Sequence, residues 1–194
     1  MASKDTFARI IQEDRAAHES QSWKGSFLDY LEKVREDPTI PKLAHARLYD
    51  LIIRAGSEDI QSTDDAGAKR LYKDEPLKTY NFFRDEFFGI EKTVSQIVRY
   101  FHSASLKGEE SRQVLYLMGP VGSGKSSLVE RLQRGLEESE PFYAIAGSTM
   151  NEEPLQLIPK HLRREFEKML GVHIEGDISP VTRFRLDHEF GGKY

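Results

Sequence analysis

The sequence predicts an α/β fold whose core is a parallel sheet, preceded by a helical region at the N-terminus. Two short apolar runs, V-L-Y-L-M at residues 114–118 and F-Y-A-I-A at residues 142–146, are typical of strands buried on both faces. Between them, residues 125–138 carry apolar side chains at helical spacing, which gives the strand, helix, strand order of an α/β domain. The N-terminal part differs, because its periodicity is helical.

The N-terminal part is expected to form three helices. The first starts near Phe7, and the second starts at Ser26, which has Asp29 three residues later as in a capping box. The third begins at Pro41, a residue suited to a first helical turn, and ends at Gly56.

A polar, weakly periodic stretch follows at residues 57–80, which we interpret as a linker or a mobile loop. It sets the expected domain boundary. Residues 1–80 form a helical N-terminal region with a polar linker, and residues 81–194 form the first part of the α/β domain.

Three more helices are expected after the boundary, in addition to the one at 125–138. One begins near Ile90 with a continuous apolar face, and one spans about 160–170 and ends at Gly171. The last spans about 180–190, with Ser179 as its N-cap.

The composition excludes several classes of protein. Of 194 residues, 38% are hydrophobic and 31% are charged, and no apolar run approaches the roughly 20 residues that cross a bilayer. The chain has no cysteine and no apolar leader, which favours the cytoplasm. Its net charge of −4 disfavours nucleic-acid binding. We therefore expect a cytoplasmic protein that contacts neither membranes nor nucleic acids.

A phosphate-binding motif follows the first apolar run. Residues 119–126 read G-P-V-G-S-G-K-S, which fits the P-loop or Walker A pattern G-x-x-x-x-G-K-[ST], with an expected strand before it and a helix after it. Glycines let the backbone turn and bring its N–H groups against phosphate oxygens. The lysine places an ammonium beside the β- and γ-phosphates, and the serine hydroxyl can ligate Mg²⁺. The motif predicts nucleotide binding, which we expect to involve ATP with Mg²⁺.

The predicted nucleotide-binding residues form one continuous stretch. They are Gly119, Pro120, Val121, Gly122, Ser123, Gly124, Lys125, Ser126 and Ser127. Ser126 is the predicted Mg²⁺ ligand.

The sequence does not supply the second carboxylate that P-loop enzymes use to position Mg²⁺ and water. The nearest candidates are Glu175 and Asp177 in G-V-H-I-E-G-D, but the apolar run before them is broken, so a loop position is expected instead. No catalytic residue can be assigned. We expect this chain to bind nucleotide and to turn it over poorly.

Other chemistry is less prominent in the sequence. The histidines include no close helical pair with a carboxylate, and the chain has no cysteine, so a zinc site is not expected. The H-R-D and D-F-G motifs of eukaryotic kinases are absent. The aromatic cluster of Phe82, Phe83, Phe87 and Phe88 suits a core or an interface, with adenine contact as the alternative.

Several uncommon segments, in this order, resemble the N-terminal region of the bacterial PrkA family, whose members are named serine protein kinases. They include S-W-K-G-S-F-L-D-Y-L-E-K-V, L-Y-L-M-G-P-V-G-S-G-K-S-S-L-V-E-R-L and Y-A-I-A-G-S-T-M-N-E-E-P-L-Q-L-I-P. The resemblance runs from about Trp23 to the end of the chain. It implies the N-terminal portion of a longer protein with an AAA+-like P-loop module, incomplete here at its C-terminal side. It also implies that F-F-G-I-E at 87–91 packs near adenine.

Three functions stay open at this point. The family name favours the ATP-binding portion of a kinase that transfers phosphate to protein serine. The architecture resembles an AAA+ ATPase that remodels or helps degrade proteins, and fold analogy does not decide between them. The third is a non-catalytic nucleotide-binding module. For the longer protein we expect an enzyme that acts on a protein substrate, with homo-oligomer formation as an option.

Overall fold

The chain divides into two compact units. The structure, a computed structural model, describes residues 4–64, 66–73, 75–140 and 142–193. One unit is Lys42–Phe142, and the other combines Met1–Pro41 with Tyr143–Tyr194. This division differs from the expected boundary near residue 80, which lies inside the first of these units; the domain assignment itself stays a prediction.

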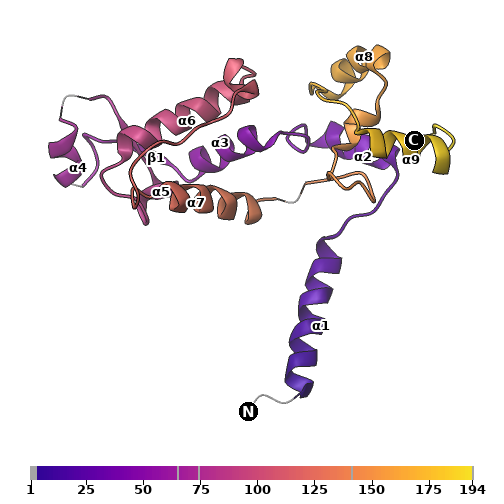
Figure 1. The fold of residues 1–194 in the computed structure, drawn as a ribbon, viewed down its shortest axis with the longest axis horizontal. Helices are drawn as coiled ribbons and strands as arrows, with labels where there is room; N and C mark the ends of the chain where they lie inside the picture. Colours follow the sequence, from indigo (N-terminus) through magenta and orange to yellow (C-terminus); the bar gives the residue numbers. More distant parts are fainter. Residues whose placement is uncertain (1–3, 65, 74, 141, 194) are drawn as a thin grey trace. The chain divides into compact units, whose positions relative to one another are not determined.

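The unit of residues 42–142 is mainly helical (Figure 1). Its elements are α3 (Ala44–Arg54), β1 (Ser57–Asp59), α4 (Ala66–Leu71), β2 (Lys78–Tyr80), α5 (Asn81–Arg84), α6 (Glu91–Ser105), the 3-10 turn η1 (Glu109–Arg112) and α7 (Lys125–Glu137). Helix α3 packs against both α6 and α7. Helices α6 and α7 confirm the two helices that were expected to begin near Ile90 and at Lys125.

The core of this unit lies between α3, α5, α6 and α7. Each helix presents one apolar face to it, as the 3.6-residue period requires. The buried side chains are Leu48, Ile52, Phe82, Phe83, Val94, Ile97, Val98, Phe101, Leu128 and Leu132. Since α7 contributes two of them, this core fixes the helix that follows the glycine-rich loop.

Residues 57–80 carry regular structure, although the sequence was interpreted as a linker or mobile loop. Strands β1 and β2 pair antiparallel, with Ser57 opposite Tyr80 and Asp59 opposite Lys78. A small separate core of Ile60, Ala68 and Tyr72 forms between them. The sequence signal was weak because each element is short and the two strands are largely polar, with β1 fully exposed and β2 half-buried.

The two expected buried strands do not form within the described residues, where β1 and β2 make the one sheet and it is antiparallel. The run 114–118 has no strand partner there, and its alternate residues Val114, Tyr116 and Met118 are 79–90% exposed. The run 142–146 is likewise not a strand. The prediction of a parallel sheet is thus not confirmed, because a buried strand needs neighbours that these residues do not provide.

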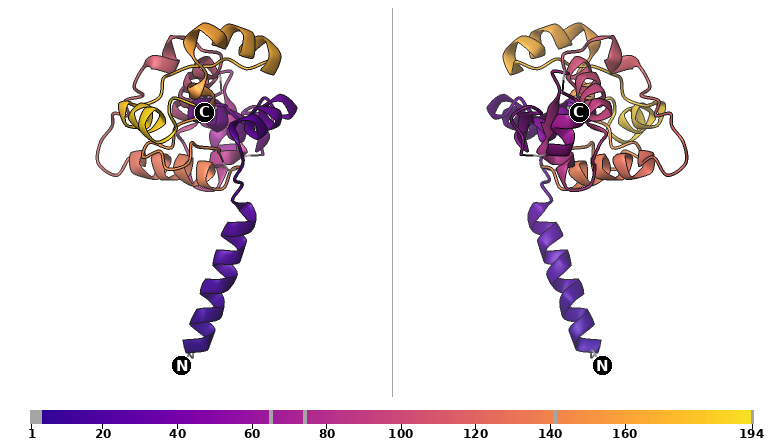
Figure 2. Two further views of the ribbon diagram at one scale, coloured as in Figure 1. Left: turned by 90° about the vertical axis from the view of Figure 1, so that its right-hand side faces the viewer. Right: turned by 90° about the vertical axis from the view of Figure 1, so that its left-hand side faces the viewer.

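The other unit contains α1 (Lys4–Gln21), α2 (Phe27–Glu36), the 3-10 turn η2 (Pro154–Leu157), α8 (Lys160–Leu170) and α9 (Pro180–Glu189). Figure 2 shows α1 as a straight helix joined to α2 by an extended segment. The core of this unit consists of Tyr30, Val34, Leu155, Ile158, Leu170 and Ile174. Within the described ranges, no helix has both the length and the apolar content to cross a membrane.

Several local sequence signals are confirmed in atomic detail. Ser26 and Asp29 form the reciprocal hydrogen bonds of a capping box at the start of α2. Helix α8 ends at Gly171, which has a left-handed φ of 68°. Ser179 caps α9 by accepting from the Thr182 backbone N–H. The third helix of the N-terminal part exists, but α3 begins at Ala44 and not at Pro41.

A buried carboxylate connects α9 to the loop that contains Ser148 and Glu152. Glu152 is 8% exposed and accepts hydrogen bonds from the Ser148 hydroxyl at 2.6 Å, the Ser179 backbone N–H and the Thr182 hydroxyl. Burial opposes its charged form, but these hydrogen bonds outweigh burial and hold the pKa of Glu152 below its ordinary value. The Glu152 carboxylate is thus buried and ionised, and its hydrogen bonds connect Ser148 to the start of α9.

Candidate functional site: a glycine-rich loop beside an aromatic pocket

The loop at residues 119–124 adopts a conformation that requires its glycines. Gly122 and Gly124 have φ angles of 80° and 79°, in the left-handed region that other residues rarely adopt. Gly119 lies so close to Ser123 that an added Cβ would come within 2.9 Å of the Ser123 hydroxyl oxygen. Gly124 is also the N-cap of α7. The loop therefore ends where the first backbone N–H groups of a helix are unpaired.

The Lys125 side chain folds back onto the loop and forms hydrogen bonds with it. Its ammonium donates to the Gly119 carbonyl at 2.9 Å, the Pro120 carbonyl at 2.6 Å and the Ser123 hydroxyl at 3.0 Å. An ammonium has three donors, so all three have a partner within the loop. The positive charge is held at the centre of the backbone turn, where a phosphate would meet it.

The electrostatics at the start of α7 favour an anion. The first turn of this 13-residue helix contains no acidic residue, and its N-terminus carries the partial positive charge of the helix dipole. Ser126 and Ser127 are exposed at the same end. A phosphate group would thus meet backbone N–H groups, an ammonium and two hydroxyls.

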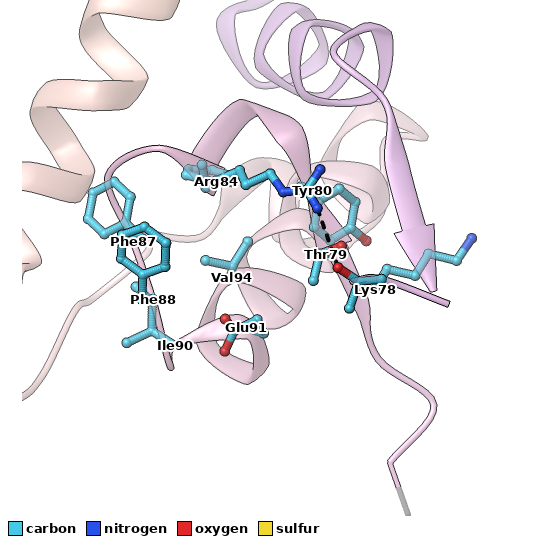
Figure 3. A pocket seen from close by; sticks show the side chains of 11 residues that line it. Lys78, Thr79, Tyr80, Arg84, Phe87, Phe88, Ile90, Glu91 and Val94 are labelled. Carbon is cyan, nitrogen blue, oxygen red and sulfur yellow. Dashed lines mark hydrogen bonds between the residues drawn. The ribbon is translucent and has the colours of Figure 1, made fainter. Parts of the chain in front are cut away.

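An aromatic side chain joins the loop to a pocket. The Cε1 atom of Phe87 lies 3.8 Å from the position that a Cβ on Gly124 would take. Figure 3 shows Phe87 and Phe88 on one side of the pocket and Lys78, Thr79 and Tyr80 on the other. Its lining residues are Thr63, Lys78, Thr79, Tyr80, Phe83, Arg84, Phe87, Phe88, Ile90, Glu91 and Val94. The pocket therefore combines apolar, partly aromatic walls with a few polar groups, as small-molecule sites commonly do.

The aromatic cluster splits between the two roles considered for it. Phe82 and Phe83 are 7% and 3% exposed and belong to the core. Phe87 is half-buried, and Phe88 is 73% exposed at the pocket. The core interpretation thus holds for the first pair, whereas adenine contact stays a prediction for the second.

A short turn shapes the floor of the pocket. The Tyr72 hydroxyl donates to the Gly89 carbonyl at 3.0 Å, and the Gly89 N–H donates to the Glu91 carboxylate at 3.1 Å. Burial raises the pKa of Tyr72, and the negative charge of Glu91 adds to the effect. The second oxygen of Glu91 is enclosed and has no hydrogen-bond partner among the residues described.

The candidate carboxylates Glu175 and Asp177 lie in the other unit, in a segment without helix or strand, and Asp177 forms ion pairs there. Asp177 contacts the Lys160 ammonium at 2.7 Å and the Arg163 guanidinium at 3.4 Å. The hydrogen bond from Lys160 holds the pKa of Asp177 below its ordinary value. Across the described part of the chain, no group of three or more metal-ligating side chains comes together.

Sequence reasoning missed the contacts that join the aromatic segment to α7. Gly135, inside α7, accommodates the Phe82 ring, and Arg134 forms a two-pronged contact with Glu86. A glycine in a helix interior costs about 1 kcal/mol relative to alanine, so Gly135 was a signal that something packs closely there. The sequence did not indicate which residue it was.

The glycine-rich loop thus runs into the N-terminus of α7 beside a small pocket. The model of the PrkA AAA domain family matches residues 25–194. The chain therefore belongs to the PrkA family, as the resemblance implied, and the match falls in the AAA domain of that family.

Two relatives carry different activities in their names. The ATP-dependent protease PrkA of Bacillus subtilis (strain 168) is 38% identical over 189 residues, which cover 94% of this chain and 28% of that protein. The serine/threonine kinase YeaG of Escherichia coli (strain K12) is 33% identical over 174 residues, covering 84% of this chain and 26% of that protein. The chain thus spans about a quarter of the length of these relatives. No solved structure matches it significantly.

Proposed function

We propose that this chain binds Mg-ATP, with the phosphates at residues 119–127, which form the glycine-rich loop and the start of α7. The backbone N–H groups and Lys125 contact the phosphates, and the Ser126 hydroxyl ligates Mg²⁺. The observation that carries the proposal is the Lys125 ammonium, which lies 2.6–3.0 Å from three loop oxygens at the N-terminus of α7. On binding, phosphate oxygens take the place of these neutral acceptors and form stronger, charge-assisted hydrogen bonds.

The adenine base lies in the pocket beside the loop. Phe87 supports this placement, because it lines the pocket and its ring also approaches Gly124 in the loop. One ligand can then place its base against Phe87 and its phosphates against Lys125. Apolar walls with few polar groups suit a flat purine.

Calorimetric titration with Mg-ATP tests the binding site. Lys125→Ala removes a charge-assisted contact, so affinity should fall roughly 10-fold to 100-fold. Lys168→Ala, which removes an exposed lysine from α8 in the other unit, is the matched control and should bind like the wild type. Equal affinity of the wild type and Lys125→Ala would refute the assignment.

In a protein of the relatives' length, the function that the site supports best is ATP hydrolysis coupled to work on a protein substrate. The relative named an ATP-dependent protease, at 38% identity the more similar of the two relatives described above, supports this function. The run 114–118 would then be a strand of a parallel sheet completed by further polypeptide. Its exposed alternate residues and lack of a partner in the described ranges support that role.

Transfer of phosphate to protein serine is the second candidate. The relative named a serine/threonine kinase supports it. The two functions differ in product, because ATP labelled on its γ-phosphate leaves label on protein in one case and in free phosphate in the other. A full-length version with its Lys125→Ala control distinguishes them. This chain alone is expected to release little phosphate, since a positioned nucleophile and a fully held Mg²⁺ are also needed.

A further inference from the structure

The base pocket and the phosphate loop are built from different segments, which must be held in register. Phe87 follows α5, whereas Gly124 and Lys125 belong to the loop and α7. A nucleotide that contacts both requires a fixed spacing between them. Contacts between residues 81–88 and α7 therefore decide whether both ends of one ligand fit at once.

The first part of this connection is buried. Phe82 packs against Gly135, where an added Cβ would lie 2.6 Å from the ring. The Arg131 guanidinium lies 4.0 Å from the centre of the same ring, and its Nε donates to the Phe82 carbonyl at 3.0 Å. These contacts hold α5 on α7, but they do so five residues before Phe87.

The second part is ionic and lies next to the pocket wall. The Nη2 atom of Arg134 in α7 donates to both oxygens of Glu86, at 2.6 and 2.8 Å. The Arg131 Nε lies 3.7 Å from the same carboxylate. Hydrogen bonds between charged partners are shorter and stronger than neutral ones. Glu86 is thus held by α7 immediately before Phe87.

The chain after Glu86 is also held by the Phe87 N–H, which donates to the Phe83 carbonyl at 3.1 Å, and by the Tyr72 hydroxyl, which donates to the Gly89 carbonyl. Phe88 is 73% exposed, and Gly89 has a left-handed φ of 74°. Phe87 itself packs edge-on against Phe83, with ring centres 6.1 Å apart. The contact of Glu86 with Arg134 thus adds an ionic link from α7 to the residue immediately before Phe87, beside the approach of Phe87 itself to Gly124.

We propose that Glu86 is a positioning residue for nucleotide binding. Held by Arg134, it keeps the Phe87 wall at the spacing from the P-loop that lets one ligand contact both. The inference rests on the proposed nucleotide site and adds a residue that touches no part of the ligand. Because the side chains of Glu86 and Arg134 are 36% and 51% exposed, their ion pair contributes little to stability, and its removal should leave the fold intact.

The test compares two ligands that share phosphates but not a base. Calorimetry measures the affinities of Mg-ATP and Mg-tripolyphosphate for the wild type, Glu86→Ala, Arg134→Ala and the double variant. Glu86→Ala should weaken Mg-ATP roughly threefold to fivefold and change Mg-tripolyphosphate less than twofold. Arg134→Ala should give the same split, and the double variant should lose no more than either single one. Asp85→Ala, which removes the neighbouring exposed charge, is the matched control and should bind both ligands normally.

The outcomes separate this inference from the proposed function. Unchanged Mg-ATP affinity in Glu86→Ala, or an equal loss for both ligands, would overturn the positioning role while Lys125→Ala still tests the phosphate site. Additive losses in the double variant would also overturn it, since the two residues would then act separately. A wild-type chain that binds neither ligand would instead refute the nucleotide site and, with it, the role of Glu86. Thermal unfolding followed by circular dichroism checks that each variant is folded.

Discussion

Replacing Gly135 with alanine tests the packing that joins the aromatic segment to the P-loop helix. Gly135 is buried in the last turn of α7, and its added Cβ would lie 2.6 and 2.8 Å from the Cζ and Cε2 atoms of Phe82. Ordinary contacts begin at about 3.4 Å, so the ring or the helix must move. The ring has little room, because Arg131 lies 4.0 Å from its centre and Phe83 packs against it edge-on.

Two effects of opposite sign set the size of the change. Alanine stabilises a helix interior by about 1 kcal/mol relative to glycine. Overpacking a filled core costs about 1–3 kcal/mol. The upper part of that range applies, because Phe82 is 7% exposed and its ring is in contact with Arg131 and Phe83. We therefore expect Gly135→Ala to lower the free energy of unfolding by about 1–2 kcal/mol.

Urea unfolding followed by far-ultraviolet circular dichroism measures this change as a lower midpoint with an unchanged slope. Gln133→Ala, at an exposed position of the same helix, is the control and should shift the midpoint little. Adding Phe82→Leu to Gly135→Ala should recover part of the loss, since the smaller side chain removes the clash. A Gly135→Ala chain as stable as the wild type, or more stable, would show that helix propensity dominates and that the packing argument is wrong.

Three further predictions concern other parts of the molecule. The pKa of Glu152 is lower in the folded chain than its ordinary value of 4.5, so its ionised form stabilises the fold above pH 4.5. This stabilisation is lost as the pH falls through the pKa of Glu152 in the folded chain. The urea midpoints at pH 7 and pH 4 should therefore differ more for the wild type than for Glu152→Gln. Ser26→Ala should destabilise α2 by about 1 kcal/mol, seen as faster amide hydrogen exchange in its first turn, and unchanged exchange would contradict the capping box. Phe87→Ala should weaken the binding of Mg-ATP but not that of Mg-tripolyphosphate in calorimetry, and an equal loss of affinity for both ligands would contradict the placement of the base in the pocket.

Features encoded within a few neighbouring residues could be predicted from the sequence. The Ser26 and Asp29 capping box, the end of α8 at Gly171 and the start of α7 at Lys125 are all local, and each is found in the structure. The same applies to the left-handed glycines of the loop, because only glycine tolerates that backbone conformation readily.

Features that depend on distant partners could not be predicted in the same way. The apolar run at 114–118 has the composition of a buried strand, but strand formation needs a neighbour, and composition does not supply one. The pairing of β1 with β2 was missed because both strands are three residues long and largely polar. Likewise, a glycine at position 135 of a helix indicates close packing, but its partner Phe82 can be identified only from the structure.

The central claim is that phosphates bind to the backbone of residues 119–127, and nuclear magnetic resonance of the chain labelled with ¹⁵N-glycine tests it most directly. On addition of Mg-ADP, the amide signals of Gly119, Gly122 and Gly124 should move, because their N–H groups lie in the loop that receives the phosphates. The signals of Gly171 and Gly191, in the other compact unit, should stay in place. Saturating Mg-ADP that leaves the three loop signals unmoved, or that moves only glycines outside the loop, would contradict the account.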